Sequence, residues 1–374
     1  MQKTILIISS NLGGGHRSAS EALAQIITQS KPEFTAQIVD ISPPLGSVTY
    51  RFFSNYFTDI FIKNWRAFNN PISARLLHLL IVPLIIPRIL PLLKQYSPRI
   101  IIATQAFVLD SIALTLKQMN LSIPLILVLV DPFSIHHAWT MFKEADLYLL
   151  PNQHSFRVFR HRGINPKRLS ITGHPIRLIP STTLRAPLSS WRKKLGLNPK
   201  KLTIFLGGSG EGVGRLDLII HGLLKQPQLL NSVQIIIACG KNKSLFKQLT
   251  LLKKQHSRLL FPYGFYPEMY NLIKAADVVV GKPGPNLMFE TIALAKPFLT
   301  TGHPLGQEVG NYRFISKEKL GLVTYSPTQT TKKILAIIKT PSLLNQYQPA
   351  LLHHQRLLRQ TPRRCIGALK PFLK

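Results

Sequence analysis

The feature that most constrains the fold of this chain is a short apolar segment followed at once by glycines, and it occurs twice. Residues 4–9 read Thr-Ile-Leu-Ile-Ile-Ser and precede the glycines at 13–15. Residues 201–206 read Lys-Leu-Thr-Ile-Phe-Leu and precede a second glycine run that begins at Gly207. Short apolar runs are typical of buried parallel strands, and a glycine turn that leads into a helix is typical of Rossmann-like units. The pattern therefore predicts two such units.

Apolar segments continue to alternate with stretches of helical composition through both halves. Further strands are expected at residues 37–40, 99–103, 124–130, 147–150, 169–172, 233–238 and 278–280. This alternation predicts an α/β protein built from doubly wound parallel sheets. Three prolines between residues 173 and 190 break regular structure. We therefore expect a first domain at 1–173, a second at 174–342, and a basic helical return segment at 343–374.

The composition narrows the function classes. The chain has 374 residues, enough for two domains, and 45% of them are hydrophobic, which excludes a largely disordered protein. Lys and Arg number 47 against 15 Asp and Glu, a net charge of +32 that predicts attraction to nucleic acid, anionic lipid or phosphorylated substrates. The two cysteines exclude a disulfide framework and a multi-cysteine zinc site, and they indicate a reducing compartment. We expect no signal peptide and no apolar run long enough to span a bilayer.

The first glycine turn, at residues 11–16, ends in His16. Glycines let a backbone approach a ligand closely, and the helix that follows offers unpaired N–H groups and a partial positive charge. A dinucleotide-binding turn is the alternative, with Gly13, Gly15 and Ser18 at its glycine positions and Asp40 as the ribose acid. A lone histidine is more often structural. However, a histidine on a glycine turn at the carboxyl edge of a sheet favours a functional role for His16.

Two further turns carry candidate ligand-binding residues. The second glycine run is either a tight strand-to-helix turn or a phosphate contact. After residue 280 a strand ends at a Pro-Gly turn where a helix begins, which suits a diphosphate. Glu290 lies about a turn and a half into that helix, and its carboxylate suits a ribose diol, although a solvated helix face is the alternative. The candidates in these regions are Gly208, Ser209, Gly210, Phe265, Lys282, Pro283, Gly284, Pro285, Asn286, Glu290, Gln307, Glu308 and Asn311.

The chain resembles one glycosyltransferase family, because it carries the family's motifs in the same order. They are Gly-Gly-Gly-His16, Gly-Gly-Ser209-Gly, Lys282-Pro-Gly-Pro, Glu290 and Gly-Gln307-Glu308 followed by Asn311. The family includes monogalactosyldiacylglycerol synthase, bacterial processive diacylglycerol glucosyltransferase and the peptidoglycan N-acetylglucosaminyltransferase of the lipid II pathway. The motifs look most similar to those of the diacylglycerol branch.

The resemblance implies a GT-B fold, with two Rossmann-like domains facing a cleft, a UDP-sugar donor, inversion at the anomeric carbon and a lipid acceptor in a membrane. By motif position, Glu290 binds the donor ribose and His16 falls on the acceptor-side histidine. The resemblance also places Gln307 and Glu308 at the sugar hydroxyls with support from Asn311, and the backbone at Gly208, Ser209, Pro283, Gly284 and Pro285 at uracil and diphosphate.

An inverting transfer needs a base for the acceptor hydroxyl and a stabiliser for the leaving UDP. His16, on the turn that contains Gly14 and Gly15, is the expected base, oriented by Asp131 after the strand at 124–130. Asp131 itself is the rival base. The chain carries no Asp-X-Asp motif, so we expect no metal and no cofactor. Helix dipoles and backbone N–H groups are expected to neutralise the diphosphate instead.

The region at residues 50–94 mixes aromatic residues with Arg and then becomes rich in Leu, Ile and Pro. This composition suits a lipid headgroup interface, and together with the net charge it predicts a peripheral location at an anionic membrane, on its cytoplasmic face. A packed pair of hydrophobic helices is the alternative. Three other functions stay open: transfer to a polyprenyl-linked or other lipid, UDP-sugar epimerisation, and nucleic-acid binding. The last of these lacks a zinc-finger, RNP-type or basic-zipper motif.

Overall fold

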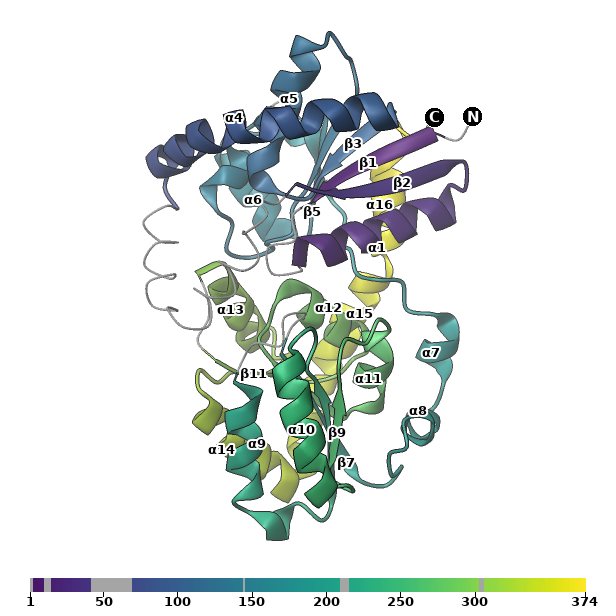
Figure 1. Ribbon diagram of the computed structural model, residues 1–374, viewed down its shortest axis with the longest axis vertical. Coiled ribbons are helices and arrows are strands. Elements are labelled where there is room, and N and C mark those ends of the chain that lie inside the picture. Colours follow the sequence, from purple (N-terminus) through teal and green to yellow (C-terminus); the bar gives the residue numbers. More distant parts are fainter. Residues whose placement is uncertain (1–2, 10–14, 42–68, 144, 209–214, 303–305) are drawn as a thin grey trace. The chain divides into compact units, whose positions relative to one another are not determined.

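The structure is a computed structural model that describes residues 3–9, 15–41, 69–143, 145–208, 215–302 and 306–374. The chain forms two compact units (Figure 1). The first contains residues 1–178, 305–310 and 357–374, and the second contains residues 179–304 and 311–356. The structure thus divides the chain between Leu178 and Ile179 rather than at residue 173. It also splits the C-terminal segment between the two units.

The first unit is built on a six-stranded sheet with the order β2-β1-β3-β4-β5-β6, in which every pairing is parallel. Its strands are β1 (Lys3–Ser9), β2 (Phe34–Asp40), β3 (Ile100–Ala103), β4 (Leu125–Val128), β5 (Leu147–Leu150) and β6 (Leu169–Ile171). Helices α1 (Gly15–Ser30), α4 (Pro71–Tyr96), α5 (Leu109–Gln118), α6 (Gln153–His161) and α16 (Thr361–Leu369) accompany it. The strand order reverses between β1 and β3, so the connections that leave these two adjacent strands run to opposite faces of the sheet and leave room for a ligand at its carboxyl edge.

The second unit contains another six-stranded parallel sheet, with the order β12-β11-β10-β7-β8-β9. Its strands are β7 (Leu202–Gly207), β8 (Val233–Ala238), β9 (Leu260–Tyr263), β10 (Val278–Gly281), β11 (Phe298–Thr300) and β12 (Gly321–Leu322). Its helices are α7 (Ser181–Arg185), α8 (Leu188–Lys194), α9 (Leu216–Leu224), α10 (Lys243–Gln255), α11 (Met269–Ala275), α12 (Pro285–Ala293), α13 (Val309–Lys317, from Asn311 onward), α14 (Pro327–Lys339) and most of α15 (Gln348–Arg359). Here the order reverses between β7 and β10.

Burial explains why these segments form parallel sheets. Residues Ile5–Ile8 of β1 are 0% exposed because helices cover both faces of the sheet. Helix α1 turns Ala19, Leu23, Ile26 and Ile27 toward this core, the i, i+4, i+7 spacing of an amphipathic helix. Near the C-terminus, Leu369 joins the same apolar cluster, which anchors α16 to the first unit.

Helix α4 contradicts the expectation that no apolar segment is long enough to span a bilayer. It runs unbroken for 26 residues although it contains Pro83, Pro87 and Pro91. These prolines are spaced four apart, so the carbonyl groups that lose their N–H partners lie along one line of the helix. By length and composition alone α4 is able to cross a bilayer, with 24% of its most apolar window buried. The aromatic residues expected to lead into it, at 50–68, lie outside the described residues.

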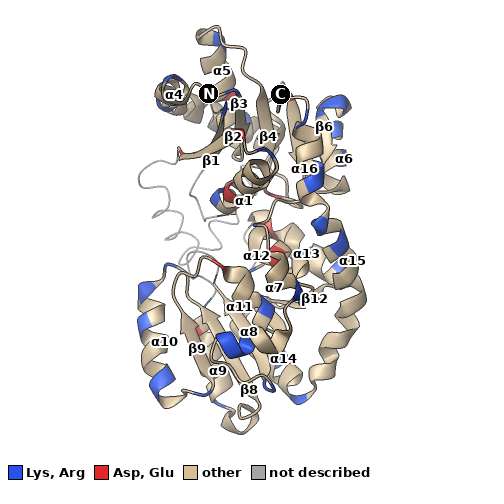
Figure 2. Cartoon of the chain, turned by 90° about the vertical axis from the view of Figure 1, so that its right-hand side faces the viewer, with Lys and Arg blue, Asp and Glu red and all other residues tan. Residues whose placement is uncertain are grey.

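Basic residues greatly outnumber acidic residues, and they are spread over both units. Figure 2 shows Lys and Arg on many helices of both units, including α6, α8, α10 and α15, while Asp and Glu are few. The dispersal agrees with the sequence, in which basic residues occur mostly as singles or pairs. No single helix therefore accounts for the net charge.

Candidate functional site

His16 lies at the point where the first sheet reverses its order. It is the second residue of α1, directly after the turn from β1, and its Nδ1 lies 2.6 Å from the carbonyl oxygen of Thr104, which follows β3. A carbonyl oxygen only accepts hydrogen bonds, so Nδ1 carries the proton and Nε2 keeps its lone pair. The hydroxyl of Ser20 bonds both the carbonyl of His16 and Oγ1 of Thr104, at 2.9 Å each. The imidazole is thus fixed in the tautomer that a general base requires.

Asp131 follows β4 at the same edge of the sheet. Its Oδ2 accepts a 2.9 Å hydrogen bond from Nε1 of Trp139, and the indole ring stacks on the imidazole of His16 with centroids 6.1 Å apart. Loss of solvation raises the pKa of the Asp131 carboxyl; the nearby His16 and the Trp139 hydrogen bond oppose this increase, and the charge of Glu308 adds to it. The structure therefore brings the two predicted catalytic residues together through a tryptophan.

Glu308 and Gln307 also belong to the first unit. They lie in a 3₁₀ turn at Gly306–Glu308, and Gly310 just after it donates a 2.8 Å backbone hydrogen bond to Oγ of Ser134. A Cβ at Gly310 would lie 2.5 Å from Cβ of Phe133, so only glycine allows this close approach. The turn packs beside Asp131, and Oε1 of Gln307 is buried without a hydrogen-bond partner among the described residues.

The other predicted residues gather at the reversal point of the second sheet. Strands β7 and β10 end side by side at Gly207 and Gly281, and a Cβ at Gly281 would lie 2.6 Å from the carbonyl oxygen of Gly207. Residues 282–284 then lead into α12. Its first residue is Pro285, and Gly284 supplies no side-chain cap. The N-cap residue therefore offers no side-chain acceptor to the first N–H groups of α12, and such a helix N-terminus suits an anion.

Glu290 is 5% exposed and Lys282 is 9% exposed, although both are charged. The solvated helix face considered as the alternative for Glu290 is therefore wrong. Asn311, at 1% exposure, donates through Nδ2 to the carbonyl oxygen of Pro283 at 2.7 Å, while its Oδ1 has no partner among the described residues. This hydrogen bond holds α13 against the turn that precedes α12.

The remaining candidates are placed as follows. Phe265 is 62% exposed just after β9, Asn286 is the second residue of α12, and Gly208 follows β7. Gly15 is the first residue of α1. Gly14, Ser209 and Gly210 lie outside the described residues. Within the described part of the chain, no group of three or more His, Cys, Asp or Glu side chains is arranged to hold a metal ion.

Two models of known protein families match the two regions of the chain that form most of the two sheets. Residues 16–176 match the family model of monogalactosyldiacylglycerol (MGDG) synthase, and residues 203–337 match that of the glycosyltransferase family 28 C-terminal domain. The chain is a glycosyltransferase, and its two halves match these two family models. The resemblance drawn from the sequence is thereby confirmed, and the two matches fall on the two sheets in turn.

Relatives span nearly the whole glycosyltransferase. The processive diacylglycerol beta-glucosyltransferase of Bacillus cereus (strain B4264) is 24% identical over 93% of this chain and 88% of its own length. Monogalactosyldiacylglycerol synthase 1 of Arabidopsis thaliana is 26% identical over 88% of this chain and 64% of its own length.

Solved structures share the fold. UGT71G1 of Medicago truncatula, solved with UDP-glucose, has a TM-score of 0.64 at 12% identity and covers 100% of this chain and 99% of its own. HepE of Anabaena, solved with UDP, has a TM-score of 0.55 at 14% identity and covers 99% of this chain and 98% of its own. The predicted architecture, two Rossmann-like domains of the GT-B class, is confirmed.

Two residues at the first sheet's edge were not found from the sequence, Thr104 and Trp139. The carbonyl of Thr104 is a backbone group, so its residue type carries no signal. Trp139 lies eight residues beyond Asp131 in a short 3₁₀ turn, and no spacing rule links the two positions.

The hydrogen bond from Trp139 gives a test of the Asp131 carboxylate. Trp139→Phe keeps an aromatic ring over His16 but removes the N–H that stabilises the ionised carboxylate. The pKa of Asp131 therefore rises further, and the acidic limb of the kcat/KM profile for glycosyl transfer moves to higher pH. Trp191→Phe is the matched control, because Nε1 of Trp191 has no partner among the described residues. An unchanged acidic limb in Trp139→Phe would remove Asp131 from the pH dependence.

Proposed function

We propose that this glycosyltransferase moves a hexose from a UDP-sugar to diacylglycerol, with inversion at the anomeric carbon. The observation that carries the proposal is the imidazole of His16, held by Thr104 with Nε2 unprotonated beside Asp131, in the region that matches the MGDG synthase model. The relatives named as diacylglycerol glucosyltransferase and MGDG synthase support diacylglycerol as the acceptor.

The donor is assigned to the second unit. The buried carboxylate of Glu290 suits the two hydroxyls of a ribose, and the uncapped start of α12 suits a diphosphate. Asn311 presents a buried Oδ1 that is free to accept from a donor hydroxyl. Solved structures of this fold hold UDP and UDP-glucose, which supports a uridine diphosphate sugar.

The chemistry follows from the tautomer of His16. Nε2 takes the proton of the acceptor hydroxyl as its oxygen attacks the anomeric carbon; the bond from that carbon to the UDP oxygen breaks and UDP leaves with the electron pair. Asp131 stabilises the imidazolium that forms, because each of the two charges favours the other. The geometry thus favours His16 as the base over Asp131, whose Oδ2 already accepts from Trp139. The N-terminus of α12 stabilises the leaving diphosphate without a metal ion.

The acceptor lipid is assigned to the face of α4 that is open to solvent. Ile72, Leu76, Leu79, Leu80 and Leu84 are between 58% and 82% exposed, whereas Ile85, Ile89 and Leu93 on the same helix are buried. An exposed apolar face of this size on one helix is typical of a membrane contact. We assign a peripheral position at the cytoplasmic face of an anionic membrane, where the net charge of +32 adds attraction to acidic lipids.

His16→Ala tests the base. Removing a general base slows turnover by roughly 10²–10⁴-fold, and UDP affinity should stay unchanged because the donor binds to the second unit. The assay mixes the enzyme with diacylglycerol vesicles and a panel of UDP-sugars and identifies the lipid product and its anomeric configuration. Turnover within a few-fold of the unsubstituted enzyme would exclude His16 as base. Interconversion of UDP-sugars without a lipid product would favour epimerisation.

Glu290→Gln tests the donor site. The amide keeps the volume of the buried side chain but loses the charge, so UDP affinity should fall by about tenfold or more, as expected for a hydrogen bond to a charged group. Isothermal titration with UDP measures it. Glu318→Gln is the control, since it removes the same charge from the same unit at a partly exposed position. Equal UDP affinity in both variants would place the ribose elsewhere.

The exposed face of α4 is tested by flotation with vesicles of phosphatidylglycerol and diacylglycerol. Leu80→Gln combined with Leu84→Gln removes two side chains that are 64% and 70% exposed. Their transfer into lipid is worth about 1.5–3 kcal/mol each, so membrane binding should drop more than tenfold. Leu114→Gln with Leu121→Gln, at 43% and 38% exposure in the same unit, should leave binding unchanged. Equal flotation of the two pairs would contradict the assignment.

A further inference from the structure

A cavity of about 740 Å³ lies at the amino edge of the second sheet, within the second unit. Lys200 and Lys201 precede β7, Asp277 precedes β10, and Lys296 lies two residues before β11. Because all strands of this sheet are parallel, their first residues share one edge and the donor turns share the other. The six residues of β7 span roughly 20 Å. The cavity is therefore separate from the site assigned to the donor.

The lining of this cavity is strongly cationic. Five of its fifteen residues are Lys or Arg and one is acidic, whereas 47 of the 374 residues of the chain are Lys or Arg. The cavity thus holds more than twice the share of basic residues expected from composition. The excess is not a general effect of a basic protein.

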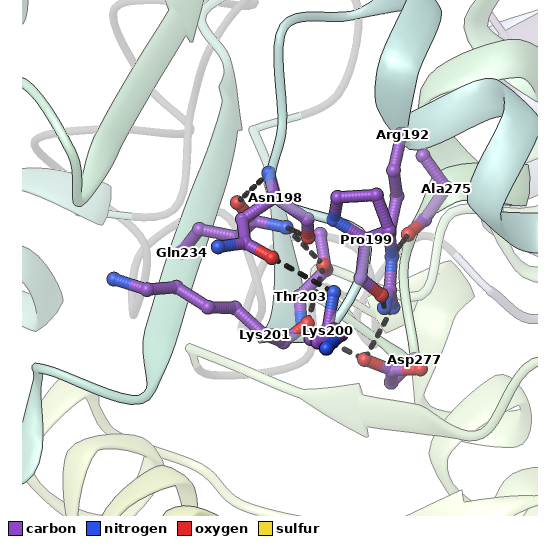
Figure 3. Close-up of polar contacts among 9 residues, drawn as sticks. All are labelled: Arg192, Asn198, Pro199, Lys200, Lys201, Thr203, Gln234, Ala275 and Asp277. Atoms are coloured by element: carbon purple, nitrogen blue, oxygen red, sulfur yellow. Dashed lines mark hydrogen bonds and ion pairs between the residues drawn. The ribbon is translucent and has the colours of Figure 1, made fainter.

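Arg192 and Asp277 neutralise each other and hold the floor of the cavity (Figure 3). Arg192 is 4% exposed and donates to the carbonyl oxygens of Ala275 at 3.0 Å and Pro199 at 2.9 Å, and to Oδ2 of Asp277 at 2.6 Å. The same Oδ2 accepts from the backbone N–H of Thr203 at 2.7 Å. The Asp277 carboxylate, the single one in the lining, and the Arg192 guanidinium are therefore already engaged in hydrogen bonds within the protein.

A buried glutamine fixes the loop that carries Lys200 and Lys201. Nε2 of Gln234 donates to the carbonyl oxygen of Asn198 and to Oγ1 of Thr203, both at 2.8 Å, while its Oε1 accepts from the N–H of Asn198 at 2.9 Å. Asn198 in turn accepts from the N–H of Lys200 at 2.9 Å. Figure 3 shows the side chain of Lys201 extending away from Arg192 and Asp277. These hydrogen bonds fix the backbone of the loop. They do not involve the ammonium groups of Lys200 and Lys201.

Besides Arg192, the lining contains four lysines, whose ammonium groups are the other positive charges of the cavity. Nζ of Lys274 donates to the carbonyl oxygen of Leu184 at 3.0 Å, which leaves two of its N–H groups. No residue in the described part of the chain accepts from the ammonium groups of Lys200, Lys201 or Lys296. Desolvation lowers the pKa of Lys296 to about 8; repulsion from Lys274 and Arg192 adds to this and attraction by Asp277 opposes it. Among the described residues, Asp277 compensates the desolvation of the Lys296 ammonium only in part, which costs stability.

We propose that this cavity binds a phosphate-bearing organic ligand. The ammonium groups of Lys200, Lys274 and Lys296 would surround the phosphate, and Leu188, Leu294 and Leu344 of the lining would contact the organic part. Ammonium groups act as point charges with rotatable donors and suit a tetrahedral phosphate, while the planar fork that suits a carboxylate, on Arg192, is already occupied. The volume lies within the range of small-ligand sites. The ligand is either a soluble phosphate ester or the headgroup of an anionic phospholipid.

Isothermal titration with glycerol 3-phosphate in saturating UDP tests the site, because UDP blocks phosphate binding at the donor turns. Lys200→Gln combined with Lys296→Met removes two of the cations. Lys332→Gln combined with Lys333→Gln removes the same charge from exposed positions of α14 in the same unit. Binding should weaken about tenfold or more in the first pair and less than twofold in the second. No saturable binding to the unsubstituted enzyme, or equal affinity in both pairs, would overturn the proposal.

Thermal unfolding gives a second readout. Lys296→Met removes a desolvated ammonium, so the midpoint without ligand should rise while the stabilisation by glycerol 3-phosphate is lost. In the unsubstituted protein, Lys296 sheds its proton in the folded state near pH 8 but in the unfolded state only near the usual lysine pKa of about 10.4. Stability should therefore rise between these values. If Lys296→Met does not fold, Lys200→Gln alone, at an exposed position, still tests binding.

The source of the phosphate is separated by flotation with phosphatidylcholine vesicles that contain or lack phosphatidylglycerol. If the ligand is a lipid headgroup, the Lys200→Gln, Lys296→Met pair binds the anionic vesicles less than the Lys332, Lys333 pair does. If it is a soluble ester, the two pairs float equally while glycerol 3-phosphate binding differs. Both results support the site, and the titration alone decides whether the site exists.

Discussion

The hydrogen bond from His16 to the carbonyl of Thr104 is the interaction on which the chemistry proposed for the first unit depends. It joins the residues that follow β1 and β3, the two strands between which the sheet order reverses. The connections that leave these two strands run to opposite faces of the sheet and leave a crevice at its edge. A side chain anchored across this crevice can face a ligand with one nitrogen fixed. The second sheet reverses its order between β7 and β10, which end at Gly207 and Gly281, and a Cβ at Gly281 would lie 2.6 Å from the carbonyl oxygen of Gly207.

Acidic residues are scarce in this chain, so each carboxylate strongly affects the charge balance of its surroundings. Only 15 of 374 residues are Asp or Glu, yet Asp131 follows β4, Asp277 precedes β10, and Glu290 is buried within α12. Asp131 is desolvated, which raises its pKa, and the nearby charge of Glu308 works in the same direction. A carboxylate in this setting remains ionised only when cationic or N–H partners stabilise it. His16 and Trp139 provide this stabilisation at Asp131.

The sequence predicted features that depend on neighbouring residues, such as strands and helices. It did not predict contacts between residues that are far apart in the chain. Nine of the twelve strands that the structure describes, and the helix that carries Glu290, are local patterns that the sequence predicted, whereas β9, β11 and β12 were not predicted. Trp139 and Thr104 contribute through contacts with His16 across 123 and 88 positions of the chain. Likewise, residues 305–310 join the first unit although the sequence assigned them to the second domain. The sequence predicted no apolar run long enough to span a bilayer, but the four-residue spacing of Pro83, Pro87 and Pro91 permits one helix of 26 residues in α4.

The two sites proposed in the second unit would offer phosphate different environments on opposite edges of one sheet. At the carboxyl edge, the start of α12 provides backbone N–H groups, which neither titrate nor move. At the amino edge, lysine side chains provide the charge, and one of them loses its proton near pH 8. Backbone dipoles in a structured turn hold their strength as pH rises, whereas a lysine cluster weakens as its members deprotonate and as salt screens them. A ligand at the amino edge thus responds to pH and ionic strength under conditions in which a donor held by backbone groups does not.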